Sequence, residues 1–429
     1  METFMNNTNR IKSCFLAADI LLPDFDKVDG TKWATIACDQ FTSEPEYWEA
    51  AAEIAEGSPS TLNLMIPEVY LSETEERLSK VHNAMDDYLK EVLVSHSDSM
   101  IYVEREQSDG RTRRGIVGVV DLECYDYTKG ASALIRATEG TVLSRIPPRV
   151  KVRRDARIEL PHIMMLIDDP EKTVIEPLAE KTDGFSSAYD FDLMLGGGHI
   201  KGFFIDGESQ YEVISALSGI VSPEEMKKKY GDGNLAPLLF AVGDGNHSLA
   251  TAKAAFEEIK EREGEAAMQS PARYALAEVV NLHDEALDFE PIYRVVFNAD
   301  TDDLISSFKK YAAALNGNAR VQKTVCIYNG REEEILVDHP VQQLTVGTLQ
   351  AFLDEYAASH HEIEIDYIHD EDSLRALAAK ENAIGFLFDG MEKDELFRTV
   401  IFDGALPRKT FSMGHARDKR YYLDCRKIK

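Results

Sequence analysis

The sequence predicts an α+β protein in which helices and strands are mixed, and three observations carry that prediction. Apolar segments of strand length alternate with helical segments through the C-terminal half of the chain. The N-terminal half carries an amphipathic helical pattern and a charged hairpin. Self-similarity at a period of about 20–50 residues is not apparent, so a repeat solenoid is excluded.

In the N-terminal half, Leu78, Val81 and Met85 recur at helical spacing and predict a long helix. Asp109-Gly110 lies in a charged stretch between two apolar segments, which is typical of a hairpin turn. Residues 196–198 are three glycines; they fit a flexible turn better than a phosphate cradle, because no helix follows at once. The predicted helices cover residues 46–56 and 73–94, and the predicted strands cover residues 100–103, 115–122 and 163–167.

In the C-terminal half, strand and helix patterns follow one another in turn. The predicted strands cover residues 238–242, 273–282, 293–297, 321–328, 363–368 and 384–388. The predicted helices cover residues 249–263, 302–315, 346–358 and 372–379. At 429 residues the chain is long for one core, so we expect an N-terminal α+β region over 1–230 and a C-terminal α/β region over 231–429, unless both form one compact unit.

Composition excludes several function classes. Lys and Arg total 47 against 76 Asp and Glu, so the net charge is −29 and bulk nucleic-acid binding is disfavoured. No stretch reaches the ~18 apolar residues of a membrane span. Five cysteines without a CxxC pair predict reduced thiols in a cytoplasmic protein, and no histidine spacing supports zinc.

The most informative segment is residues 238–248, an apolar strand that runs through a glycine-bracketed turn into a helix. Gly243 and Gly245 permit a tight turn and close approach of a ligand to the backbone. The helix that follows would point its N–H groups and positive dipole end into the turn, a geometry suited to phosphate or carboxylate. Asp244 would act as a base or hold a metal, and His247 would donate to an anion.

A simpler interpretation of the same segment also stands. Asn246 or Ser248 would then serve only as a helix cap, worth about 1 kcal/mol. Asp244 would hydrogen-bond within the turn, and His247 would pack at the surface.

The chain resembles the domain of unknown function 1015 family of bacterial and archaeal proteins. In that family a strand ends in a D-G-H-H-R-like string, which is Asp-Gly-Asn-His-Ser at 244–248 here. Four further segments resemble family motifs: residues 37–41, 136–141, 291–296 and 406–410. This sequence carries Thr138, Tyr293 and Ser248 where the family has two histidines and an arginine.

The same string is similar to the phosphate-binding turn of the ParB/sulfiredoxin-like fold, which includes nucleotide-binding segregation proteins and a free-serine kinase. That resemblance implies a strand–turn–helix element around residues 238–263 that holds nucleotide phosphates.

These patterns together give a candidate site. The candidate catalytic residues are Asp244, His247 and Glu139. The candidate phosphate- or ligand-binding residues are Gly243, Gly245, Asn246, Ser248, Arg136, Thr141, Arg294, Arg408 and Lys409. Mg²⁺ bound mainly through substrate phosphates, and ATP or ADP, are the cofactors that the sequence leaves open.

Two segments are basic against an acidic background. Six basic residues lie between Arg145 and Arg157, and eight lie between Arg408 and Lys429. Each segment is either an anion clamp or a solvent-facing surface. Pro147-Pro148 predicts an extended loop or edge segment for the first, and Tyr421-Tyr422 predicts a final strand in the second.

Three functions remain open from the sequence. The first is a cytoplasmic enzyme that binds a nucleotide or another small phosphorylated molecule, and most specifically a kinase of a small, serine-like acceptor. The second is a nucleotide- or metabolite-binding regulator without turnover, and the third is a metal-dependent hydrolase. No membrane partner is expected, and the oligomeric state is left open.

Overall fold

The computed structural model describes residue 11, residues 13–140 and residues 146–429, and it divides into two compact units. Unit 1 comprises residues 1–137, 141–287 and 415–429, and unit 2 comprises residues 138–140 and 288–414. The predicted boundary at residue 230 falls inside unit 1, where the strands on both sides of it belong to one sheet. The α+β class predicted from the sequence is confirmed.

Unit 1 is built on a ten-stranded mixed sheet of order β11-β12-β5-β6-β14-β10-β13-β8-β7, with β1 also pairing with β6. In chain order these strands are β1 (Phe15–Leu16), β5 (Ile101–Glu106), β6 (Thr112–Asp121), β7 (Tyr125–Asp126), β8 (Ile135–Ala137), β10 (Met164–Ile167), β11 (Ser186–Asp192), β12 (His199–Phe204), β13 (Phe240–Asp244) and β14 (Tyr274–Asn281).

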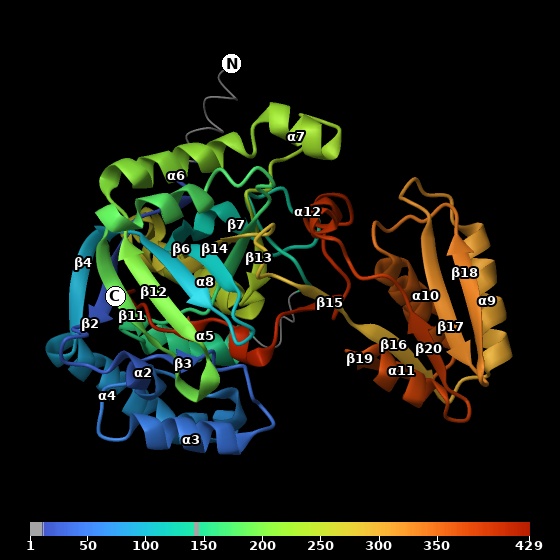
Figure 1. The fold of residues 1–429 in the computed structure, drawn as a ribbon, viewed down its shortest axis with the longest axis horizontal. Coiled ribbons are helices and arrows are strands. Elements are labelled where there is room, and N and C mark those ends of the chain that lie inside the picture. Colours follow the sequence, from blue (N-terminus) through green and yellow to red (C-terminus); the bar gives the residue numbers. More distant parts are fainter. Residues whose placement is uncertain (1–10, 12, 141–145) are drawn as a thin grey trace. The chain divides into compact units, whose positions relative to one another are not determined.

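Alternation along the strands gives this sheet two buried faces. Ile101 and Val103 of β5 belong to one core and Tyr102 to the other. The first core includes residues of α2 (Gly30–Trp33), α3 (Pro45–Ala55) and α4 (Thr74–Glu91). The second includes residues of α6 (Gly207–Gly219) and α8 (Asn246–Glu263), through Val213, Leu249 and Phe256. Helix α7 (Pro223–Tyr230) follows α6 in the chain. Figure 1 shows the blue helices α3 and α4 and the yellow-green helix α6 on opposite sides of the strands.

The C-terminal segment 415–429 is integrated into unit 1 through short strand pairs. β22 (Tyr421–Tyr422) pairs with β3 (Thr35–Ile36), and β23 (Arg426–Lys427) pairs with β9 (Ile158–Glu159). The strand predicted at 421–422 is therefore confirmed, but it is not the final strand, because β23 follows it. A further two-stranded pair joins β2 (Ala18–Pro23) to β4 (Leu93–Ser99).

The prediction of an extended loop or edge segment at Pro147-Pro148 is wrong. It lies in α5 (Ile146–Asp155), near the first turn of the helix. Proline is tolerated there because the first N–H groups of a helix have no intrahelical acceptor and the fixed φ of proline suits the helix.

Unit 2 contains a five-stranded antiparallel sheet of order β18-β17-β20-β16-β19. Its strands are β16 (Tyr293–Phe297), β17 (Gln322–Tyr328), β18 (Arg331–Val337), β19 (Glu364–Ile368) and β20 (Ile384–Leu387). Its helices are α9 (Thr301–Ala314), α10 (Thr345–Ser359), α11 (Glu371–Ala378) and α12 (Lys393–Phe402). A separate pair joins β15 (Phe289–Pro291) to β21 (Phe411–Met413). Phe308 of α9 stacks on Phe352 of α10 with ring centroids 4.8 Å apart, which joins these two helices.

Within the described residues, no helix combines the length and apolar character that crossing a bilayer requires.

Candidate functional site

Asp244 ends β13 at the point where the sequence analysis placed the turn. Its Oδ1 accepts the N–H of Gly245 at 2.8 Å, and its Oδ2 lies 3.4 Å from Nζ of Lys419. Gly245 has φ +77° and precedes α8 without a side chain to cap the helix. The first N–H groups of this 18-residue helix therefore start beside the Asp244 carboxylate.

His162 lies just before β10 and is 5% exposed. Its Nδ1 is 2.8 Å from the hydroxyl of Tyr422. That hydroxyl donates to Sγ of Cys38 at 3.1 Å, so we assign the proton of this contact to His162 Nδ1. The Nε2 atom then faces Asp39, whose Oδ2 lies 3.4 Å away.

Asp39 follows β3, and the C-terminal segment fixes this part of the chain. The N–H of Ala37 donates to the carbonyl of Arg420 at 3.1 Å, next to the β3–β22 pair. The Asp39 carboxylate also accepts a hydrogen bond from Gln40 Nε2 at 3.0 Å. Three segments distant in sequence thus meet through residues 415–429.

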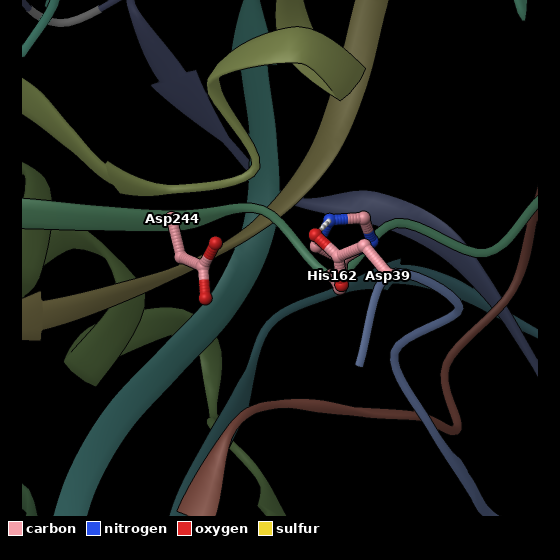
Figure 2. Close-up of side chains that lie close together, drawn as sticks. All are labelled: Asp39, His162 and Asp244. Atoms are coloured by element: carbon pink, nitrogen blue, oxygen red, sulfur yellow. Dashed lines mark ion pairs between the residues drawn. The ribbon is translucent and has the colours of Figure 1, made fainter. Parts of the chain in front are cut away.

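Asp39, His162 and Asp244 each offer one ligand atom, and these three atoms lie within 4.8 Å of one another. Figure 2 shows Asp39 paired with His162 and Asp244 across from them. Two carboxylates and one imidazole suit a divalent cation. We call these three residues the acidic triad.

Their neighbours shift the pKa values of Asp39 and His162. Burial acts to raise the pKa of Asp39, but His162, Gln40 and Lys419 outweigh it and hold that pKa well below its usual range. Burial acts to lower the pKa of His162, but the carboxylates of Asp39 and Asp244 outweigh it and raise that pKa. The Asp39 carboxylate is therefore ionised at neutral pH and available to a cation.

The other predicted turn residues lie beside Asp244 with differing surroundings. A Cβ on Gly243 would stand 2.8 Å from Cγ of Leu166, so close packing requires glycine there. Asn246 donates from Nδ2 to the carbonyl of Val242 at 3.3 Å. Ser248 Oγ lies 3.5 Å from Nε2 of His162, which brings this predicted ligand residue to the triad. His247 is partly buried in the first turn of α8, and its carbonyl accepts from Thr251.

Arg136 is 4% exposed, and its guanidinium donates to main-chain carbonyls. The acceptors are Ala133 at 2.8 Å, Ala236 at 2.9 Å and Pro237 at 3.3 Å. These contacts fix the segment that leads into β13, so Arg136 positions the Asp244 strand.

Four predicted residues belong to unit 2 and one lies outside the described residues. Glu139 forms a β-bridge with Leu406. Arg294 is fully buried, donates to Gln350 and to the carbonyl of Arg408, and burial lowers its pKa to about 10. Nζ of Lys409, which has φ +51°, lies 4.6 Å from the ring centroid of Tyr367. Arg408 pairs with Asp354 at 3.2 Å. Thr141 lies outside the described residues.

The described basic residues of α5 and Arg157, which follows that helix, are paired with acids. Arg154 binds Glu258 at 2.9 Å and Arg157 lies 3.3 Å from Asp86. The remaining described pairs are Arg149–Glu68, Lys151–Glu75 and Arg153–Glu159. Acidic residues from other elements thus neutralise this segment, which fits the surface interpretation better than the anion clamp.

The C-terminal basic segment is largely internal. Arg420 pairs with Glu278 and, at 2.6 Å, with Asp424, and all three side chains are at most 5% exposed. Arg426 pairs with Glu159 at 2.8 Å. Lys419 is the residue of this segment that reaches the Asp244 turn.

His162 and Lys419 were not predicted as site residues, and Asp39 was marked only as part of a motif. His162 stands alone in sequence without a second histidine nearby, so no spacing marks it. The aspartate in the motif at residues 37–41 was the one available signal for Asp39.

Comparison with known proteins gives a family and distant structural neighbours. The sequence profile described as "Protein of unknown function (DUF1015)" matches residues 23–356. No curated protein matches the sequence.

Three solved structures are similar at low TM-scores. One is a free serine kinase in complex with AMP, with 11% identity, 72% of this chain and 90% of that chain covered, and a TM-score of 0.35. A conserved hypothetical protein from Pyrococcus furiosus has 11% identity, coverage of 72% and 94%, and a TM-score of 0.32. C-terminally truncated SbnI from Staphylococcus aureus has 8% identity, coverage of 70% and 82%, and a TM-score of 0.33. Because the profile spans well over half of the sequence, the chain belongs to the DUF1015 family of proteins of unknown function.

Proposed function

We propose that the protein is a divalent-cation-dependent phosphotransferase that moves a phosphoryl group from a nucleotide to the hydroxyl group of a small molecule. The observation that carries the proposal is the acidic triad of Asp39, His162 and Asp244 at the start of α8. A triad of this kind would occupy up to three positions of a divalent cation and leave others for water and phosphate oxygens.

The surroundings of the triad supply the rest of a phosphate site. The N-terminus of α8 presents main-chain N–H groups and the positive end of the helix dipole. Lys419, 3.4 Å from Asp244, adds a cation on the same side. Bound between carboxylates and phosphates, a divalent cation would neutralise charge as it develops on the transferred group.

The residues of the chain then orient and deprotonate the acceptor. Asp39 would accept the proton of the acceptor hydroxyl, and the Tyr422–His162 hydrogen bond would hold the imidazole in place. Transfer needs positioning and charge neutralisation more than covalent catalysis, so a small set of groups suffices.

Cation binding is the first test. Purified protein is titrated with Mg²⁺, Mn²⁺ and Zn²⁺ by calorimetry, and Asp39→Asn and Asp244→Asn should each weaken binding at least about tenfold. Asp302→Asn, which changes a surface carboxylate of α9 that is 81% exposed, is the matched control and should bind like the parent. Equal affinity in all four proteins would exclude the triad as a cation site.

Turnover is the second test. The protein is incubated with ATP or ADP, the preferred cation and hydroxyl acceptors that include serine, and products are followed by ³¹P NMR. A phosphorylated acceptor supports the proposal. Release of inorganic phosphate alone would identify the hydrolase instead, and nucleotide binding without any product would identify the regulator.

The Lys419→Met variant tests nucleotide binding and cation binding separately. It should weaken nucleotide binding, because a phosphate contact is lost, while cation binding is retained or strengthened because Lys419 no longer competes for Asp244. Unchanged nucleotide affinity would remove Lys419 from the phosphate site.

A further inference from the structure

A cavity of about 220 Å³ in unit 1 opens beside His162. Most of its wall is apolar and comes from the segment before α4, from α4 itself, and from α5 and β9 with the residues around them. Apolar lining residues from these parts include Met65, Val81, Met85, Val152 and Ile158.

One end of the cavity is polar and is shared with the candidate site. His162, Ser248 and Tyr422 line it, and the first two are joined at 3.5 Å. Because Nε2 of His162 also lies 3.4 Å from Asp39, a molecule in the cavity can place one end at the acidic triad.

The charged groups of the wall are already paired. Arg149 pairs with Glu68, and Arg153 pairs with Glu159, which also binds Arg426. An ammonium or carboxylate entering the cavity would lose its hydration and meet charges that are already neutralised. This wall therefore disfavours a zwitterion such as serine and favours an uncharged, apolar group.

The volume sets the size of that group. A dry apolar cavity of about 150 Å³ holds a benzene molecule, so about 220 Å³ accommodates an aromatic ring or a short branched chain with a small polar end. We infer that the acceptor is an alcohol with an apolar body, which fills this cavity and presents its hydroxyl group to Asp39 and His162. The inference rests on the proposed function and names its substrate class.

The transfer balances without a further reactant. The acceptor oxygen forms a bond to the terminal phosphorus of a nucleoside di- or triphosphate, and the bond from that phosphorus to the bridging oxygen breaks. The shortened nucleotide leaves with the electron pair of that bond, and the hydroxyl proton passes to the Asp39 carboxylate.

The experiment measures binding and transfer separately. Thermal unfolding is followed with 2-phenylethanol, hexan-1-ol or serine in the presence of Mg²⁺ and a nucleotide, and phosphorylated products are measured in parallel. Both apolar alcohols should raise the melting temperature and become phosphorylated, while serine should do neither.

Two variants fill the cavity from partly buried positions. Val152→Trp on α5 and Met65→Trp before α4 should each abolish the alcohol-induced stabilisation and raise the KM for the alcohol at least about tenfold, with kcat less affected. Val94→Trp, at a 47% exposed apolar position on β4, is the matched control and should behave like the parent. The melting temperature of each variant without ligand reports whether it is folded.

The outcomes distinguish this inference from the proposed function. Phosphorylation of serine with no binding of either alcohol would overturn the inference and leave the phosphotransferase intact. Alcohol binding that the tryptophan variants remove, without product from any nucleotide, would overturn the phosphotransferase and the acceptor role together and leave only the binding cavity. Alcohol binding unchanged in both tryptophan variants would place the ligand elsewhere and overturn the inference.

Discussion

Replacement of Arg420 by methionine should destabilise unit 1 strongly, because it removes the ion pair of buried Asp424 and leaves buried Glu278 with Arg113, 3.5 Å away. Glu278 and Asp424 both pair with Arg420, and their side chains are 3% and 2% exposed. Breaking a buried pair from one side costs about 3–5 kcal/mol. Folded proteins are stable by only about 5–15 kcal/mol, so a large share of the stability would be lost.

Arg154→Met is the matched control, since it removes the same side chain from an exposed pair. Arg154 and Glu258 are 56% and 45% exposed, and such pairs contribute about 0–1 kcal/mol. Urea unfolding monitored by far-UV circular dichroism and tryptophan fluorescence gives both free energies; both tryptophans, Trp33 and Trp48, are in unit 1. If Arg420→Met costs no more than Arg154→Met, the buried network does not stabilise the fold.

The pH dependence of the Arg420→Met loss adds a second check. Burial raises the pKa of Asp424, and Arg420 opposes that rise. A carboxyl whose folded-state pKa is raised contributes stability below its unfolded pKa and loses it as the pH rises through the folded pKa. Without Arg420 the rise is larger, so the destabilisation should be smaller at about pH 5 than at about pH 8. A loss that is the same at both pH values would show that Asp424 does not carry it.

Three further predictions concern single positions. His199 contacts Asp192 at 2.6 Å and Asp190 at 2.7 Å. Burial acts to lower the pKa of His199, but these two carboxylates outweigh it and raise that pKa. In thermal unfolding, His199→Gln should therefore reduce stability at about pH 6 and have little effect at about pH 9. Gly245→Ala should lower the free energy of unfolding by at least about 1 kcal/mol and weaken cation binding. The reason is that Gly245 has φ +77° and the new Cβ would lie 3.0 Å from the main chain just before β10. Cation binding equal to that of the parent in calorimetry would contradict this prediction. Burial raises the pKa of the Cys38 thiol to about 12, so Cys38 should react slowly with iodoacetamide at neutral pH. The Cys38→Ser variant should keep cation binding. Rapid alkylation of Cys38 at neutral pH would refute the prediction of an unreactive thiol.

The elements that the sequence predicts well are those with a local cause. The periodicity of Leu78, Val81 and Met85 predicts α4, and the glycine-bracketed turn predicts the end of β13 and the start of α8. Both signals lie within one element and its cap, so the long-range fold does not alter them. Pro147-Pro148 misled because proline excludes only the interior of a helix, and its effect depends on where the helix begins.

Only the Asp244 turn of the site could be predicted from the sequence, because the other residues of the site come from segments far apart in the chain. Asp244 is marked by its turn, whereas His162 and Lys419 have no local pattern and reach the site through the β3–β22 pair and the buried Arg420 contacts. The anion-clamp interpretation of the basic segments also depends on residues that are distant in the sequence. A run of arginines is visible in sequence, but its acidic partners are on other elements, as Glu258 is for Arg154.

Charge balance connects the acidic composition to the candidate site. The net charge is −29, and the described basic residues of α5 are paired with carboxylates. At the triad, two carboxylates face one imidazole and Lys419, which is itself paired with Asp244. A phosphate group would bring about −1.5 to −2 further charges into this set. A divalent cation would resolve the conflict, since it would bind the carboxylates and the phosphate at the same time. Nucleotide binding at this site should therefore depend on prior cation binding. Nucleotide affinity that is the same with and without the cation would contradict the phosphotransferase proposal.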